Sequence, residues 1–109
     1  MAKWVVLVYS DSADPAREAE FNEWYDKTHL ADVLAAPGIT RAVRYQNIDP
    51  KGGPGKFLAV YEVESDDIEQ TLADLRAHLA RLREAGRYSD LLVRVSLATY
   101  RQINSMDRP

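Results

Sequence analysis

Segments with the hydrophobic periodicity of β-strands alternate along this chain with segments that have the periodicity of helices. The order of these segments is compatible with few folds. Four segments are continuously apolar or alternating and rich in branched and aromatic residues, as β-strands are. They lie at residues 4–9, 39–48, 56–64 and 91–100. Within the first and last intervals between them, apolar residues recur every three or four positions, which predicts helices. The predicted fold is therefore α+β, a ferredoxin-like β-α-β-β-α-β sandwich, in a single domain over residues 1–109.

Capping residues predict where the elements begin and end. Asp14 followed by Pro15 is typical of a helix start, because the carboxylate caps the first turn and proline fits inside it. The glycine-rich residues 49–55 predict a hairpin connection, and Ser65 is the predicted cap of the second long helix, which ends near Gly86. That helix has an apolar stripe formed by Ile68, Leu72, Leu75, Leu79 and Leu82.

The first and last predicted strands carry apolar residues on both faces, although two helices cover only one face of a sheet. Val5, Leu7 and Tyr9 alternate with Trp4, Val6 and Val8, and the last strand repeats this with Leu92, Ala98 and Tyr100 against Leu91, Val93, Val95 and Leu97. A small domain buries little core of its own. We therefore expect a homodimer in which a second copy covers the bare face, with a polar tail at about residues 102–109.

Composition excludes several classes of partner and chemistry. The formal net charge of −3 leaves no basic stripe for nucleic acid. The absence of cysteine removes disulfides, thiolate nucleophiles and cysteine-bound zinc. The acidic run at residues 62–69 is interpreted as a helix cap and first turn, so no metal is expected. The apolar run after Lys3 is too short to span a bilayer and lacks a signal-peptide cleavage pattern, which predicts a cytoplasmic protein with no membrane partner.

Residues 21–29 read Phe-Asn-Glu-Trp-Tyr-Asp-Lys-Thr-His and are followed by a Pro37-Gly38 turn and a strand containing Arg44-Tyr45. This pattern resembles the dimeric α/β-barrel superfamily, and within it the EthD-like branch. There, a helix of the form F-x-x-W-Y-x-x-x-H precedes a P-G turn and an R-Y strand. The resemblance covers nearly the whole chain, because the order and lengths of the elements also match.

The resemblance implies two ferredoxin-like subunits whose sheets meet to form a barrel, with a pocket in each subunit between sheet and helices. Members of the superfamily include cofactor-free cyclases, dehydratases, isomerases and monooxygenases, haem enzymes, and proteins without known activity. The fold alone does not choose among these functions.

His29 is the strongest candidate for catalysis. An imidazole among Phe21, Trp24 and Tyr25 is partly removed from water, which lowers its pKa and keeps a neutral base available near pH 7. The alternative is a structural histidine whose ring bonds a backbone carbonyl at the end of the helix.

Tyrosine hydroxyls are the natural partners of such a base, because they stabilise a carbonyl or enolate oxygen. Tyr25 is four residues before His29, so both side chains reach the same cavity. Tyr61 and Tyr9 are the next candidates for this role, since they come from the predicted central strands. The alternative is that these tyrosines fill the core and leave their hydroxyls at the surface.

Phe21 and Trp24 are expected to form a pocket wall, which indicates an apolar or aromatic ligand. Arg44 either anchors a carboxylate or phenolate of that ligand or pairs with an acidic neighbour. His78, on the flank of the second helix, is either a surface residue or an axial haem ligand, as in some haem-degrading members of the superfamily.

The leading hypothesis is a cofactor-independent enzyme of secondary metabolism, of cyclase, dehydratase or isomerase type, that acts on a small apolar or aromatic carbonyl compound. His29 is the predicted acid and base, and Tyr25, Tyr61 and Tyr9 are the predicted oxygen-stabilising donors. The alternatives are a non-catalytic homodimer that binds an apolar metabolite, and a haem protein that uses His78.

Overall fold

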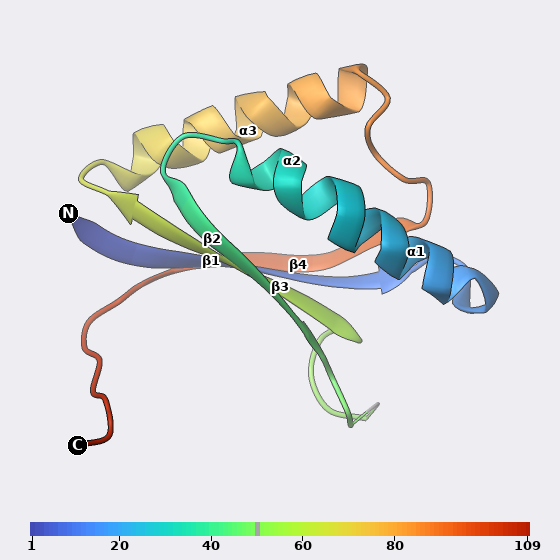
Figure 1. Cartoon of the computed structure of the whole chain (residues 1–109), viewed down its shortest axis with the longest axis horizontal. Coiled ribbons are helices and arrows are strands. Elements are labelled where there is room, and N and C mark those ends of the chain that lie inside the picture. The colour runs from blue at the N-terminus through green and yellow to red at the C-terminus, as the bar shows by residue number, and fades with distance from the viewer. Residues whose placement is uncertain (50) are drawn as a thin grey trace.

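Four antiparallel strands form one sheet, and the helices lie on one of its faces (Figure 1). The computed structural model describes residues 1–49 and 51–109. The strands are β1 (Ala2–Ser12), β2 (Ile39–Gln46), β3 (Phe57–Ser65) and β4 (Leu92–Arg101), in the spatial order β2-β3-β1-β4. The predicted ferredoxin-like β-α-β-β-α-β order is confirmed. The predicted connection at residues 49–55 includes Pro50, which lies outside the described residues.

The first helical arm is continuous but changes its winding. It consists of η1 (Pro15–Arg17), α1 (Glu18–Trp24), the π-helical turn η2 (Tyr25–His29) and α2 (Leu30–Leu34). The side chain of Asp14 accepts a hydrogen bond from the backbone N–H of Ala16 at 2.9 Å, so the predicted cap is confirmed.

The second helix, α3 (Ile68–Glu84), begins later than predicted. Its cap is Asp67, which accepts a bond from the Gln70 N–H at 3.1 Å. Ser65 still pairs with Ala2 in the sheet, so the prediction that Ser65 caps the helix is wrong. Its hydroxyl accepts from the N–H of Asp67 at 3.0 Å and lies 2.6 Å from the hydroxyl of Thr71, which fixes the turn into the helix.

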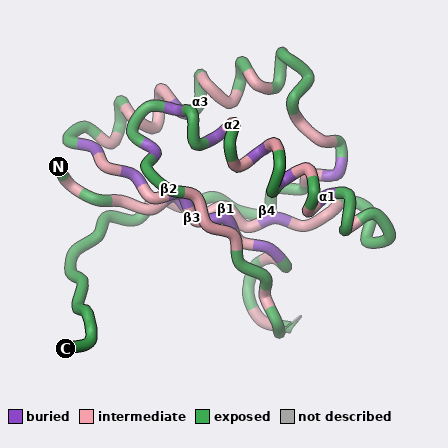
Figure 2. Tube along the Cα trace, in the orientation of Figure 1, coloured by how far each residue is buried: buried purple, intermediate pink, exposed green. Residues whose placement is uncertain are grey.

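The core lies between the sheet and the helices. In β1 the even-numbered residues point toward the helices, and Val6 lies opposite Tyr61 of β3 in the register. The buried residues lie along the strands and along the helices that pack on them (Figure 2). They are Val6, Phe21, Tyr25, Val33, Ala36, Ile39, Phe57, Ala59, Tyr61, Val63, Leu75 and Leu91.

A bulge changes which residues of β4 face the helices. Tyr9 pairs with Ser96 whereas Ser10 pairs with Arg94, so Val95 is an extra residue in the strand. As a result Arg94 and Leu97 lie on the same face, although their sequence numbers differ by three. The predicted alternation of Val93, Val95 and Leu97 along one face is therefore wrong.

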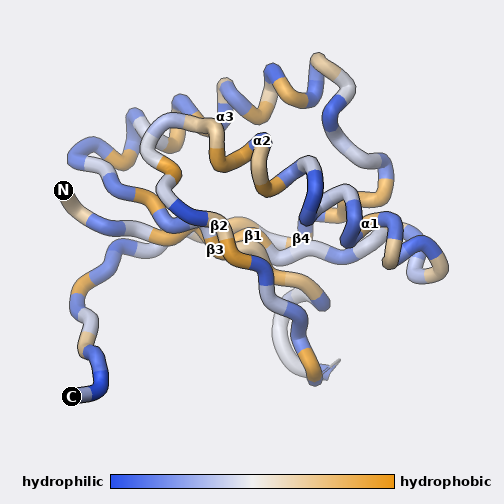
Figure 3. Tube along the Cα trace, in the orientation of Figure 1, coloured by the Kyte–Doolittle hydropathy of each residue, from blue (hydrophilic) through white to orange (hydrophobic). Residues whose placement is uncertain are grey.

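Among residues 1–49 and 51–109, no helix covers the other face of the sheet (Figure 1). Hydrophobic residues recur along its strands (Figure 3), and three large ones are exposed by 43–57%, namely Tyr45, Val93 and Tyr100. Residues 102–109 leave β4 as an exposed tail without regular structure. Among the described residues, no helix has the length and apolar character needed to cross a bilayer.

Two glycines with positive φ allow the cost of backbone strain to be compared with the cost of steric crowding when a Cβ is added. Gly38 has a φ of 85° and Gly86 has a φ of 74°. A Cβ at Gly38 would lie 3.0 Å from Cγ2 of Thr71, whose hydroxyl is held by Ser65, whereas a Cβ at Gly86 meets nothing within 4 Å. We expect Gly86→Ala to lower the free energy of unfolding by about 1 kcal/mol and Gly38→Ala by about 2 to 3 kcal/mol, measured by urea denaturation.

A Thr71→Ser background removes the methyl group that causes the contact and serves as the control. In it, the cost of Gly38→Ala is expected to approach that of Gly86→Ala. Equal costs for the two glycines in the natural background would contradict the crowding at Gly38.

Candidate functional site

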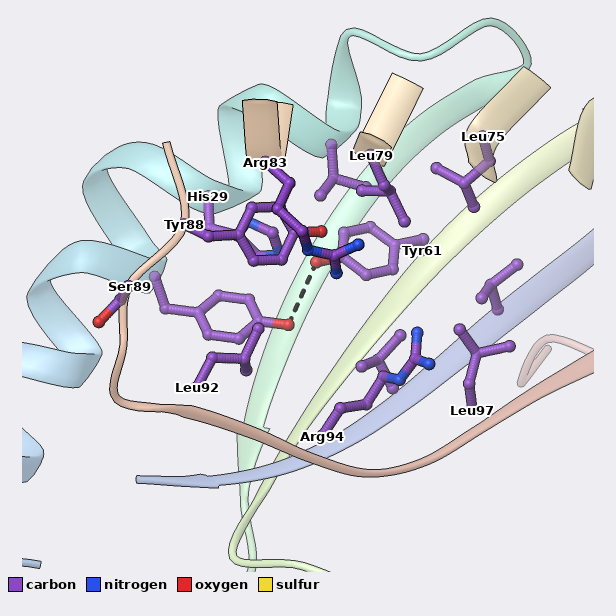
Figure 4. Close-up of a pocket in the computed structure, with 14 residues that line it drawn as sticks. His29, Tyr61, Leu75, Leu79, Arg83, Tyr88, Ser89, Leu92, Arg94 and Leu97 are labelled. Carbon is purple, nitrogen blue, oxygen red and sulfur yellow. Dashed lines mark hydrogen bonds between the residues drawn. The ribbon is translucent and has the colours of Figure 1, made fainter. Parts of the chain in front are cut away.

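A cavity of about 470 Å³ opens between the sheet and α3 (Figure 4). Its volume is in the range of small-molecule sites. Apolar walls come from Val6, Val8, Val33, Leu75, Leu79, Leu92 and Leu97. The polar and aromatic groups of the lining are Tyr25, His29, Tyr61, Arg83, Tyr88, Ser89 and Arg94. The cavity therefore combines an apolar body with a few polar groups, as ligand sites do.

The π-helical turn brings two of these groups together. The N–H of Leu30 bonds the carbonyl of Tyr25, five residues back, which widens the helix at this point. Tyr25 and His29 both lie buried on the inner side, with their rings edge to face and 4.9 Å apart. Such turns are rare and occur often at functional sites.

The His29 ring is enclosed by aromatic side chains. It stacks on Trp24 with 4.6 Å between the ring centroids and meets the edge of Tyr88 at 5.2 Å, and the residue is 6% exposed. Burial lowers the pKa of His29 to about 4, with Asp32 opposing the shift and Arg44 adding to it. The imidazole is therefore neutral at pH 7, with one nitrogen able to accept a proton.

The ring nitrogens of His29 remain accessible from the cavity. Within residues 1–49 and 51–109, neither nitrogen makes a hydrogen bond, and the fully buried side-chain atoms without a partner are Ser10 Oγ and Arg44 Nε. The structural alternative for His29, a bond to a backbone carbonyl, does not occur in this part of the chain.

The hydroxyls of Tyr25 and Tyr61 lie 3.3 Å apart and form a hydrogen-bonded pair at the wall of the cavity, marked by the dashed line in Figure 4. Burial raises the pKa of Tyr25, partly offset by the bond to Tyr61, and burial also raises the pKa of Tyr61. Both phenols stay protonated at any pH near neutrality. One hydroxyl donates to the other, so the second can donate to a ligand oxygen.

Sequence reasoning missed four polar lining residues, Arg83, Tyr88, Ser89 and Arg94. Tyr88 lies in the loop after α3, and its pKa is raised by burial, with Arg83 and Arg94 opposing the shift. Arg83 follows Leu75 and Leu79 at helical spacing, so the stripe on α3 contains a signal for it. The bulge in β4 hides Arg94, because strict alternation assigns its neighbours to the wrong faces.

Phe21 and Trp24 support the site from behind and are not part of its lining, which corrects their predicted role as the wall. Phe21 is fully buried, with its ring 5.7 Å from that of Tyr25. The indole N–H of Trp24 donates to the carbonyl of Arg87 at 3.0 Å, while its ring stacks on His29. Both side chains fix the positions of rings that do reach the cavity.

The structure does not bring Tyr9 to this cavity. As an odd-numbered residue of β1, Tyr9 points to the uncovered face of the sheet, where it lines a separate hollow with Tyr45. The prediction that Tyr9 binds substrate beside His29 is therefore wrong. The error arises because membership of a central strand does not decide which face a side chain occupies.

Arg44 also lies outside the lining. Its guanidinium donates to Asp26 at 2.8 Å and to Asn22 at 2.9 Å, and Cζ lies 4.2 Å above the ring of Tyr25. The side chain is 12% exposed. Of the two readings of Arg44, pairing with an acidic neighbour describes the structure, and a ligand anchor does not.

His78, rather than His29, bonds a backbone carbonyl. Its Nε2 atom lies 2.6 Å from the backbone oxygen of Asp32, which ties α3 to α2. The nitrogen that the haem alternative requires is therefore already engaged. Among the described residues, no cluster of three or more histidine, cysteine or carboxylate side chains offers a metal site.

No protein-family model matches the chain. The sequence is 36% identical over 47 residues to the "Core atranone cluster (CAC) protein 1" of Stachybotrys chlorohalonatus (strain IBT 40285). The match covers 43% of this chain and 20% of that longer protein.

Solved structures are similar over nearly the full length. HapK from Hahella chejuensis superposes with a TM-score of 0.69 at 18% identity, covering 97% of this chain and 98% of that one. An EthD family protein from Bacillus halodurans C-125 gives 0.59 at 17% identity, covering 94% and 100%. A dimeric ferredoxin-like protein from an uncultured marine organism gives 0.61 at 12% identity, covering 97% and 100%. The chain therefore has a ferredoxin-like fold, as these solved structures do.

Proposed function

We propose that this protein is a cofactor-independent enzyme that transfers protons on an apolar or aromatic carbonyl compound, with His29 as the base. The observation that carries the proposal is one apolar-walled cavity that holds a neutral, accessible imidazole and a pair of neutral phenols. A base and an oxygen-stabilising donor in the same site are what enolisation requires.

In the proposed reaction, His29 removes a proton from the carbon next to the carbonyl. The C–H bond breaks, an N–H bond forms, and the electron pair moves to the carbonyl oxygen. A hydrogen bond from one hydroxyl of the Tyr25–Tyr61 pair, which itself accepts a bond from the other, stabilises that oxygen as it becomes negative. Return of the proton to another atom gives isomerisation, whereas attack of the enolate carbon on a second carbonyl gives cyclisation, which loss of water completes.

The comparisons support a small-molecule role without selecting a reaction. The curated relative is named for a core atranone cluster, which favours secondary metabolism for this chain too. Because the match covers a fifth of that relative, its activity as a whole is not transferred here. Membership of the EthD-like branch is also part of the proposal, supported by the residues at 21–29 and by the similar EthD family structure.

A second candidate is a non-catalytic protein that binds the same class of compound. It is favoured by the strength of the burial effect on His29, because a pKa of about 4 makes the imidazole a weak base in the empty site. General bases work best when their pKa lies near the working pH.

The proposal includes a homodimer formed through the uncovered face of the sheet. That face carries Leu7, Val43, Leu58 and Val60 on neighbouring strands, and Tyr45 beside them is 55% exposed. A second copy of the same sheet offers matching apolar residues, and one of the similar structures is described as dimeric.

Exchange of a carbon-bound proton tests the base directly. With 2-tetralone as the substrate in D₂O, NMR measures the loss of its α-proton signal. We expect His29→Gln to lower the protein-catalysed rate by about 100-fold or more while affinity for 2-tetralone stays within about threefold. Tyr25→Phe and Tyr61→Phe are each expected to cost about tenfold or more.

Tyr45→Phe, a tyrosine change on the opposite face, is the matched control and should leave the rate unchanged. Binding of 2-tetralone without exchange, or an unchanged rate in His29→Gln, would contradict the enzyme and support the binding protein.

Burial of His29 also predicts a pH dependence of stability. Burial lowers its pKa from 6.5 to about 4, so between these values the unfolded chain binds a proton that the folded chain does not. The free energy of unfolding therefore falls as the pH decreases below 6.5. From pH 8 to pH 5, urea denaturation should show a loss about 2 kcal/mol larger in the natural protein than in His29→Gln. Equal losses would mean that His29 is not buried as a neutral ring.

The homodimer predicts twice the chain mass of 12.3 kDa in sedimentation equilibrium at micromolar concentration. Val60→Lys places a charge at the centre of the uncovered face and should give a folded monomer. Ile48→Lys, at a position 94% exposed outside the sheet, is the control and should remain dimeric. A natural protein that sediments as a monomer would refute the dimer.

A further inference from the structure

The charged side chains that line the cavity are positively charged. The whole chain has 17 acidic and 14 basic residues, and yet the lining contains Arg83 and Arg94 and not one aspartate or glutamate among the described residues. Two guanidinium groups beside an apolar cavity offer charge-assisted hydrogen bonds to an anionic group of a ligand.

The two arginines approach the cavity from opposite sides. Arg83 projects from the last turn of α3 and Arg94 from β4 (Figure 4). The Cζ atom of Arg83 lies 4.6 Å from the centre of the Tyr88 ring, which holds the guanidinium over the opening. The β4 bulge turns Arg94 inward.

Within the described ranges, no carboxylate neutralises either guanidinium. Arg17, Arg41, Arg44 and Arg87 each form an ion pair with a carboxylate, at distances of 2.6 to 3.1 Å. In the part of the chain that the structure describes, Arg83 and Arg94 form no such pair. Their donors are therefore available to a bound molecule.

We propose that the ligand of this cavity carries a carboxylate, which Arg83 and Arg94 bind at the opening while its carbonyl-bearing apolar body extends toward Tyr25 and Tyr61. The planar guanidinium matches a carboxylate with two parallel hydrogen bonds. The inference rests on the proposed function only for the position of the carbonyl group. The anchor fixes one end of the ligand, so the carbonyl arrives in a single orientation.

Both arginines are exposed, so water and salt weaken their attraction for an anion. The preference for a carboxylate should therefore be moderate and should decrease with ionic strength. A volume of about 470 Å³ accommodates two fused aromatic rings with substituents.

Two probes of equal shape test the anchor. The first is 6-acetyl-2-naphthoate, and the second is its neutral amide, 6-acetyl-2-naphthamide. Titration calorimetry at pH 8 and low salt should show the acid binding about tenfold tighter than the amide. Arg83→Gln and Arg94→Gln should each weaken the acid about threefold to tenfold, and the double variant should abolish the preference. Affinity for the amide should stay within about twofold, which shows that each variant keeps an intact cavity.

Arg81→Gln is the matched control, because Arg81 is exposed on the same helix and outside the lining. It should leave both affinities unchanged, and 0.5 M NaCl should reduce the preference in the natural protein. Equal affinities for acid and amide, equal weakening of both by the arginine variants, or failure of the acid to bind at 1 mM would each overturn the proposal. These outcomes are separate from failure of the proposed enzyme, because 2-tetralone carries no carboxylate and its exchange reports on His29.

Discussion

The stacking of Arg44 on Tyr25 holds the first helical arm to the sheet, and the geometry of the site depends on it. Arg44 comes from the edge strand β2, and its guanidinium lies 4.2 Å from the Tyr25 ring and 5.2 Å from that of Phe57. The bonds to Asp26 and Asn22 attach the same group to the helix. Removing a guanidinium from water is costly, and the aromatic faces and charge-assisted bonds offset this cost. These contacts therefore fix the distance between the π-helical turn and the sheet.

The other side of the cavity depends on Asp32. Its backbone oxygen bonds His78 of α3, and its carboxylate binds Arg87 through two bonds of 2.9 and 3.0 Å. Asp32 thus joins α2, α3 and the loop that carries Tyr88. Leu75 is buried in the core and borders the cavity, and Leu79 and Arg83 farther along α3 continue its lining. The bonds of Asp32 to His78 and Arg87 hold the C-terminal half of α3 and the loop after it, and the cavity lies beneath this half of the helix.

The sequence alone predicted the architecture, because hydrophobic periodicity and capping residues are local signals. It also predicted that Tyr25 and His29 share one cavity, since four-residue spacing places both on one side of the helix. Tyr61 joins them because its register opposite Val6 places it on the face toward the helices, which strand membership alone does not decide. The prediction from sequence failed where the pairing of strands that are distant in the sequence decides which face of the sheet a side chain occupies. The face that Tyr9 occupies depends on how β1 meets its neighbours, and the face of Arg94 depends on a bulge that no single residue marks. Whether Arg44 faces a ligand or Asp26 is likewise decided only when β2 and the helix are brought together.

The lining of the cavity divides along the chain. The imidazole and the phenol pair lie between residues 25 and 61, whereas Arg83, Tyr88, Arg94 and Leu97 all come from a short stretch near the C-terminus. The two groups are carried by different elements and meet where the Tyr88 ring lies 5.2 Å from His29 and where Trp24 donates to the Arg87 carbonyl. Genetic variation at Arg83, Arg94 and Leu97 can therefore alter which molecules enter, while Arg87 and Tyr88 continue to support the histidine. A protein arranged in this way can change its ligand preference through substitutions at one end of its pocket.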